Sequence, residues 1–135
     1  MSSKKELIKR LNEAMAWELA GCIQYMQAAV MLTGHGREVF HEFFHDSSKE
    51  ARDHAELVGD KIAVLGGIPT VEPARVRQAA DVDGMLEAAL ALDPGFAQAW
   101  ANRAILRDEL GDAEGAMEDY RKALELDPKL GEPPS

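Results

Sequence analysis

Two stretches of the chain carry side chains that could bind a metal ion. In the first, residues 4–33, apolar side chains recur at helical spacing, and Glu18 stands in the middle of the apolar stripe. A carboxylate among apolar side chains costs free energy unless it is hydrogen-bonded, paired or bound to a cation. Glu18 therefore either bonds a buried Tyr, His or Lys of a neighbouring helix or acts as a metal ligand.

The second stretch, residues 37–65, adds a carboxylate and an imidazole. His54 lies on the inner face of this expected helix, and Glu50 lies at the edge of that face, one turn earlier. His41 and His45 fall on the opposite side, where we expect exposure to solvent rather than metal binding. One inward Glu and a Glu–His pair on the next helix match the carboxylate-bridged di-iron pattern of helical bundles. Oxygen and imidazole ligands suit iron or manganese.

The elements that must position these residues are two long helices. Helix-forming residues dominate and no alternating strand pattern occurs, so the fold class is expected to be all-α. The sequence GHG at 34–36 breaks the first helix, and the sequence GGIP at 66–69 ends the second. Because the turn between them is so short, residues 1–66 should form an antiparallel hairpin. Residues 67–81 contain two prolines without periodicity and are expected to be a linker.

An internal repeat marks residues 82–135. The segment AALALDP at 88–94 returns as KALELDP at 122–128, after 34 residues. This is the tetratricopeptide period, and about 82–128 resembles one and a half repeats of that family. The resemblance implies a module for oligomerisation or for binding a protein or peptide partner. It assigns packing and turn positions to Trp100, Ala104, Gly111, Ala116, Tyr120, Ala123 and Pro128.

A second resemblance covers residues 4–93. The sequence LNE at 11–13, Glu18 with Tyr25 seven residues later, and His54 followed by LGGIP at 65–69 are similar to the first half of bacterioferritins and related ferritin-like proteins. The resemblance implies that the hairpin is half of a ferritin-like four-helix bundle. It implies Glu18 and His54 as ligands of a di-iron or di-manganese site, with Tyr25 near the metal. Ferroxidase-like oxidation of Fe²⁺ is left open as an activity.

Two departures from the ferritin-like pattern bear on the metal. Ala51 stands three residues before His54, where the family has a bridging Glu. Glu50 is one place off, about 100° around the helix, and could still reach inward as a third ligand. Arg52 occupies the place of the haem-binding Met of bacterioferritins, so no haem is expected. The alternative function is a structural or interaction protein, a natural or engineered fusion without metal chemistry.

The expected hairpin is longer than anything that follows it in the chain. Residues 82–135 offer only short helices, which cannot cover an apolar stripe of about 40 Å. Such a stripe marks an interface, so we expect a homodimer or higher homo-oligomer formed through the hairpin. Two copies would supply two sets of Glu18, Glu50 and His54.

Composition and charge exclude several classes of protein. The 135 residues contain a single cysteine, Cys22, which excludes an intrachain disulfide and a cysteine-rich zinc site. The net charge of −9 opposes binding to nucleic acid or to an anionic membrane surface. No apolar run is long enough to span a bilayer and no signal peptide is recognisable, so the expected location is the cytoplasm.

Overall fold

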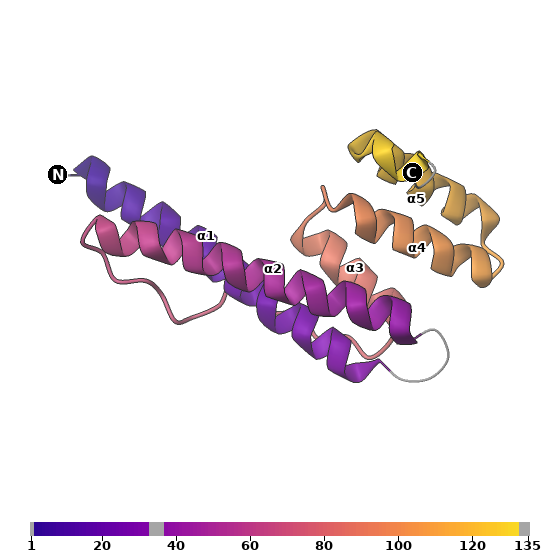
Figure 1. Cartoon of the computed structure of the whole chain (residues 1–135), viewed down its shortest axis with the longest axis horizontal. Helices are drawn as coiled ribbons and strands as arrows, with labels where there is room; N and C mark the ends of the chain where they lie inside the picture. The colour runs from indigo at the N-terminus through magenta and orange to yellow at the C-terminus, as the bar shows by residue number, and fades with distance from the viewer. Residues whose placement is uncertain (1, 33–36, 133–135) are drawn as a thin grey trace. The chain divides into compact units, whose positions relative to one another are not determined.

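The computed structural model describes residues 2–32 and 37–132, and its regular elements are helices. They are α1 (Ser2–Met31), α2 (Arg37–Val64), α3 (Val82–Leu92), α4 (Ala97–Glu109), α5 (Ala113–Leu126) and the 3₁₀ helix η1 (Pro128–Gly131), as Figure 1 shows. No strand occurs in the described ranges, which confirms the all-α prediction. None of these helices is both long and apolar enough to cross a membrane. The turn expected at 34–36 lies outside the described residues.

The chain divides into two compact units, Met1–Gln78 and Ala79–Ser135. The first contains α1, α2 and the segment after α2, and the second contains α3, α4 and α5. The expected linker at 67–81 is therefore divided between the units. Its larger part, residues 67–78, belongs with the hairpin and is called the crossover segment below.

Helices α1 and α2 form the expected antiparallel hairpin, with their axes side by side (Figure 1). Phe44 and Ile62 of α2 are fully buried, and the ring of Tyr25 on α1 stacks on Phe44 with centroids 6.3 Å apart. Ala51 and Ala55 are buried on the same side of α2. Large side chains alternating with alanines allow two helices to approach closely and still exclude water. The seam therefore holds opposing residues of α1 and α2 in a fixed register.

The end of α2 follows from two consecutive glycines. Gly66 has φ +87°, a left-handed conformation that glycine adopts without steric cost. Its neighbour Gly67 donates its N–H to the carbonyl of Ile62 at 2.9 Å, which satisfies a carbonyl of the last turn. The predicted stop at 66–69 is thus confirmed.

The crossover segment is fixed to α1 by hydrogen bonds. The Asn12 side chain donates from Nδ2 to the carbonyl of Ile68 at 3.1 Å and accepts at Oδ1 from the N–H of Thr70 at 2.8 Å. Farther along, the N–H of Arg77 donates to Oε1 of the buried Gln24 at 3.2 Å. Residues later in the segment contact residues later in α1, so the segment runs parallel to α1. It is part of the hairpin unit rather than a free linker.

The second unit consists of short helices packed in chain order, α3 on α4 and α4 on α5. As expected, these helices are short, with 11, 13 and 14 residues. Leu86 of α3 is fully buried, and the contact faces otherwise carry small residues. The buried alanines of this unit are Ala88, Ala89, Ala99, Ala101, Ala104, Ala116 and Ala123. Gly111, in the turn between α4 and α5, has φ +87° and is the residue expected there.

The ends of α3 and α5 have the same local structure. Asp93 follows α3 with φ −139° and ψ 90°, and its N–H donates to Ala89. Asp127 follows α5 with φ −145° and ψ 93°, and its N–H donates to Ala123. Asp127 and Ala123 stand 34 residues after Asp93 and Ala89. The repeat in the sequence is therefore also a repeat of local backbone structure.

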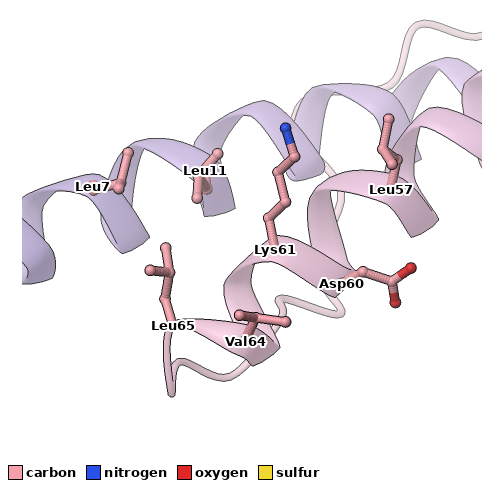
Figure 2. A pocket seen from close by; sticks show the side chains of 7 residues that line it. All are labelled: Leu7, Leu11, Leu57, Asp60, Lys61, Val64 and Leu65. Atoms are coloured by element: carbon pink, nitrogen blue, oxygen red, sulfur yellow. The ribbon is translucent and has the colours of Figure 1, made fainter.

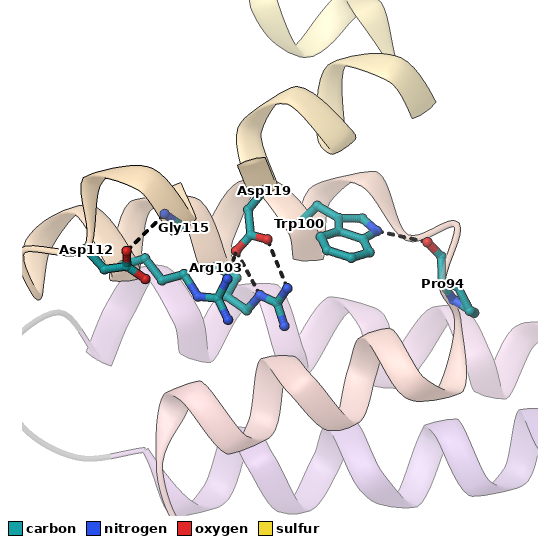
Figure 3. Close-up of polar contacts among 7 residues, drawn as sticks. Pro94, Trp100, Arg103, Asp112, Gly115 and Asp119 are labelled. Carbon is teal, nitrogen blue, oxygen red and sulfur yellow. Dashed lines mark hydrogen bonds and ion pairs between the residues drawn. The ribbon is translucent and has the colours of Figure 1, made fainter. Parts of the chain in front are cut away.

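A buried ion-pair network joins α4 to α5 (Figure 3). The Asp119 side chain, 3% exposed, accepts from Nε and Nη2 of Arg103 at 2.8 and 2.9 Å, and Nη1 of Arg107 lies 3.1 Å away. The hydrogen bond with Asp119 raises the pKa of Arg103 above its ordinary value. The Arg103 guanidinium also lies over the Trp100 ring, and the Trp100 Nε1–H donates to the carbonyl of Pro94 at 2.8 Å. These contacts join α4 to α5 and to the turn that precedes α4.

Candidate metal centre

Glu18 of α1 and His54 of α2 face each other across the hairpin. Oε2 of Glu18 lies 3.6 Å from Nδ1 of His54. The side chains are 34% and 53% exposed, so both reach solvent. At this distance the contact is a loose pairing rather than a strong hydrogen bond. Two residues that the sequence assigns to one metal site are thus neighbours in the structure.

Glu50 and Ala51 decide how many ligands one chain can offer. Glu50 is exposed, one turn before His54 on α2. Ala51 is buried in the hairpin and has no donor atom. Within residues 2–32 and 37–132, no three His, Cys, Asp or Glu side chains gather closely enough to hold a metal. The approach of Glu18 to His54 therefore provides two donors, and the role of Glu50 stays a prediction.

Tyr25 belongs to the same helical stripe as Glu18, two turns farther along α1. Its side chain is buried, and its ring packs on Phe44 as part of the seam. Its expected place near a metal stays a prediction.

Arg52 occupies an exposed position on α2, where Nε lies 3.6 Å from a carboxylate oxygen of Glu56. An arginine side chain has no thioether sulfur with which to bind haem iron. The expected absence of haem stays a prediction.

An apolar groove lies beside α1 and α2 (Figure 2). Its lining residues are Leu7, Leu11, Leu57, Asp60, Lys61, Val64 and Leu65. Leu11 precedes Glu18 by seven residues and His54 precedes Lys61 by seven, so each pair shares one helical stripe. Leu57 is 58% exposed and Val64 is 87% exposed. We call this side, which carries Glu18, Glu50, His54 and the groove, the open face of the hairpin.

Two further histidines of α2, His41 and His45, lie away from the open face. His45 is exposed, as the sequence predicts. His41 is half-buried rather than exposed, and its Nδ1 lies 2.9 Å from the carbonyl oxygen of Ala29 on α1, so the predicted exposure is wrong for this residue. The spacing of four residues between the two histidines is the signal in the sequence that could have drawn attention to them.

Comparison with known proteins relates the sequence to one family. Residues 8–119 match the ferritin family, described as a ferritin-like domain, and the match extends from the hairpin into α5. The bacterial ferritin of Pseudomonas aeruginosa is 29% identical over 138 aligned positions, covering 93% of this chain and 88% of that protein. A nutrient stress-induced DNA-binding protein of Synechococcus sp. is 27% identical over 121 positions, covering 82% of this chain and 69% of that protein.

Solved structures show the same relationship in three dimensions. The crystal structure of a ferritin-like, diiron-carboxylate protein from Bacillus anthracis is 32% identical, with a TM-score of 0.67 over 97% of this chain and 99% of that chain. A dodecameric thioferritin, the bacterioferritin-related protein of Bacteroides fragilis, is similar with a TM-score of 0.61 over 94% of this chain and 83% of that chain. At 22% identity, the second similarity shows the fold alone.

Proposed function

The chain belongs to the ferritin-like family, and we propose that it is a metal-binding member whose site is completed by a second copy of the chain. The observation that carries this proposal is the pairing of Glu18 with His54, at 3.6 Å, on the open face. A relative of similar length is described as a diiron-carboxylate protein, which supports iron as the metal.

The donor types on the open face fit iron or manganese, but one chain offers too few of them. Glu18 provides a carboxylate and His54 an imidazole, and both are ligands of these metals. Di-iron sites in four-helix bundles use a Glu from each of two helices and a Glu–His pair from each of the others. Two hairpins related by a twofold axis would bring together two copies each of Glu18, Glu50 and His54. The fit is therefore to a dimer rather than to a single chain.

The exposed apolar surface of the open face supports the same assembly. A groove lined by Leu7, Leu11 and Leu57 is a surface that a second hairpin would cover. Isologous pairing places the same patch of both copies in one interface. The Bacteroides fragilis relative is described as dodecameric, so assemblies larger than a dimer are within the proposal.

Each ligand has a distinct task in this proposal. The carboxylate of Glu18 would hold a cation and offset part of its positive charge. His54 would hold it through the lone pair of a neutral ring nitrogen. Bound iron would supply electron transfer to O₂, the ferroxidase-like chemistry left open by the sequence.

The second unit is proposed to be a tetratricopeptide-like module of one and a half repeats, used for association or for a protein or peptide partner. Supporting it are the repeated ends of α3 and α5 at Asp93 and Asp127, and buried Ala104, Ala116 and Ala123 at expected packing positions. Pro128 follows α5 as expected. Tyr120 is partly exposed and Trp100 is half-buried, so these two positions are less enclosed than the repeat implies.

Nucleic-acid binding is a function that the names of two relatives raise. Affinity for a phosphate backbone comes largely from Lys and Arg, whereas this chain has 24 acidic against 15 basic residues. We therefore propose that it does not bind DNA. A mobility-shift titration at low salt tests this, and a retarded duplex at micromolar protein would contradict it. A location in the cytoplasm is likewise kept as a proposal.

The alternative is a structural or interaction protein without metal chemistry, and Ala51 is the residue that favours it. Thermal unfolding with and without Mn²⁺ distinguishes the two functions. Metal bound only by the folded protein stabilises it by about 2.7 kcal/mol at a hundredfold excess over Kd. We expect the melting temperature of the wild type and of Glu13→Ala to rise with Mn²⁺, and that of Glu18→Ala to stay unchanged. No rise in the wild type, with no metal found by elemental analysis, would favour the alternative.

A further inference from the structure

His41 and His45 lie one turn apart on α2, in the sequence His-Glu-Phe-Phe-His. On a helix, residues four apart share a face, and two histidines at this spacing form a metal-binding pair in H-E-x-x-H motifs. The two ring centroids are 6.1 Å apart and the ring planes are inclined by only 24°. The structure thus places both histidines in one helix with their rings close together, as a metal-binding pair requires.

The hydrogen bond of His41 determines which of its ring nitrogens can bind a metal. Nδ1 lies 2.9 Å from the carbonyl oxygen of Ala29. A carbonyl oxygen only accepts, so Nδ1 carries the hydrogen and the lone pair of the neutral ring is on Nε2. A carbonyl on the far nitrogen is the usual partner of a metal-bound histidine, because it fixes the tautomer and the ring orientation. His41 is therefore preorganised as an Nε2 ligand.

His45 has a similar arrangement on the exposed side of the pair. Its Nδ1 lies 3.6 Å from Oδ1 of Asp46, and its side chain is 68% exposed. The nearby carboxylate favours a hydrogen on Nδ1 and leaves the lone pair on Nε2. Because His45 is exposed, its ring can turn toward His41 without displacing any buried side chain.

We propose that His41 and His45 form a second metal site, for a divalent cation such as Zn²⁺ that prefers nitrogen ligands. The pair is not part of the open face, since His41 is about 180° around α2 from Glu50 at 100° per residue. It therefore does not depend on the proposed function of Glu18 and His54. No cluster of three His, Cys, Asp or Glu side chains occurs in the described part of the chain. With two protein ligands, the remaining coordination positions would be filled by water.

The test is a calorimetric titration of the full chain with Zn²⁺, compared with two variants of neighbouring residues. His45→Gln removes one ligand from an exposed position and should weaken this site at least about tenfold. Glu42→Gln lies between the two histidines, keeps both of them, and should leave the affinity within about twofold of the wild type. Nitrogen-15 spectra of the histidine rings give a second readout, in which Zn²⁺ should shift Nε2 of His41 and of His45.

The proposal is supported if His45→Gln loses one zinc equivalent per chain while Glu42→Gln retains it. The ring spectra separate this site from the one proposed at Glu18 and His54. Identical zinc isotherms for the wild type and His45→Gln would overturn the proposal. Zinc-induced shifts confined to His54 would overturn it as well, and they would leave the proposed function intact.

Discussion

Both units of the chain leave some apolar side chains exposed, but they differ in how their helices are joined. In the second unit, short helices enclose Leu86 and a set of alanines, and Asp119 joins α4 to α5 from a buried position. In the first unit, two long helices share one well-packed seam but leave Leu57 and Val64 exposed on the open face. The candidate metal donors lie on that exposed side. The proposed metal site and the proposed self-association therefore use the same surface of the hairpin.

Replacement of Asp119 by Ala should have the largest effect, because it breaks the contacts that close the second unit. It leaves the Arg103 guanidinium, 13% exposed, without its carboxylate. Removal of one partner of a buried ion pair costs about 3–5 kcal/mol, and we expect a loss of about 3 kcal/mol because Arg107 is more exposed.

Urea unfolding followed by Trp100 fluorescence measures the effect of the Asp119 substitution. The chain has two tryptophans, one in each unit, so a Trp17→Phe background isolates the second unit. Asp108→Ala, at an exposed site on α4, is the matched control and should change the free energy of unfolding by less than about 0.5 kcal/mol. Equal stabilities of the two variants would mean that the network does not hold the unit together.

A charge on the open face should prevent self-association. Leu57→Asp places a carboxylate in the apolar groove, and burying it in an interface should weaken association by at least about 2 kcal/mol, or roughly thirtyfold. Sedimentation velocity at micromolar concentration measures the change. Leu110→Asp, at a comparably exposed leucine of the second unit, should leave the association constant unchanged. The opposite pattern would locate the interface in the second unit.

Loss of the Asn12 side chain should have the smallest effect of the three substitutions. Asn12→Ala removes two hydrogen bonds to the crossover segment, which should cost about 1–2 kcal/mol. Amide hydrogen exchange should show faster exchange at Thr70 in this variant, while Glu13→Ala, its exposed neighbour, keeps the wild-type rate. Unchanged protection of Thr70 in Asn12→Ala would show that other contacts fix the segment.

The sequence predicted most of the fold because its signals are local. Helical periodicity located α1 and α2, and consecutive glycines located the end of α2 at Gly66. A period of 34 residues anticipated the matching ends of α3 and α5. The same stripes predicted that Glu18 and His54 lie close together, because the packed seam of a hairpin determines which faces of its two helices meet.

The unpredicted features depend on contacts between residues far apart in sequence. Asn12 contacts a segment more than fifty residues later, and no local pattern in a proline-containing stretch indicates that it packs on a helix. Nothing in the local sequence distinguishes Arg103 and Asp119 from exposed charged residues, because their burial depends on the packing of α4 on α5. The full set of metal ligands stays a prediction, because in the described part of the structure only Glu18 and His54 of the candidate ligands lie close together.

The metal content of a monomeric variant shows whether a second copy of the chain completes the site. Wild type and Leu57→Asp would each be equilibrated with Mn²⁺, separated by size and analysed for manganese. We expect the wild type to be an oligomer with about one Mn²⁺ per chain, since each chain supplies one Glu18–His54 pair. We expect the variant to be a folded monomer without Mn²⁺. A Leu57→Asp monomer that binds Mn²⁺ as tightly as the wild type would contradict a site completed by a second copy.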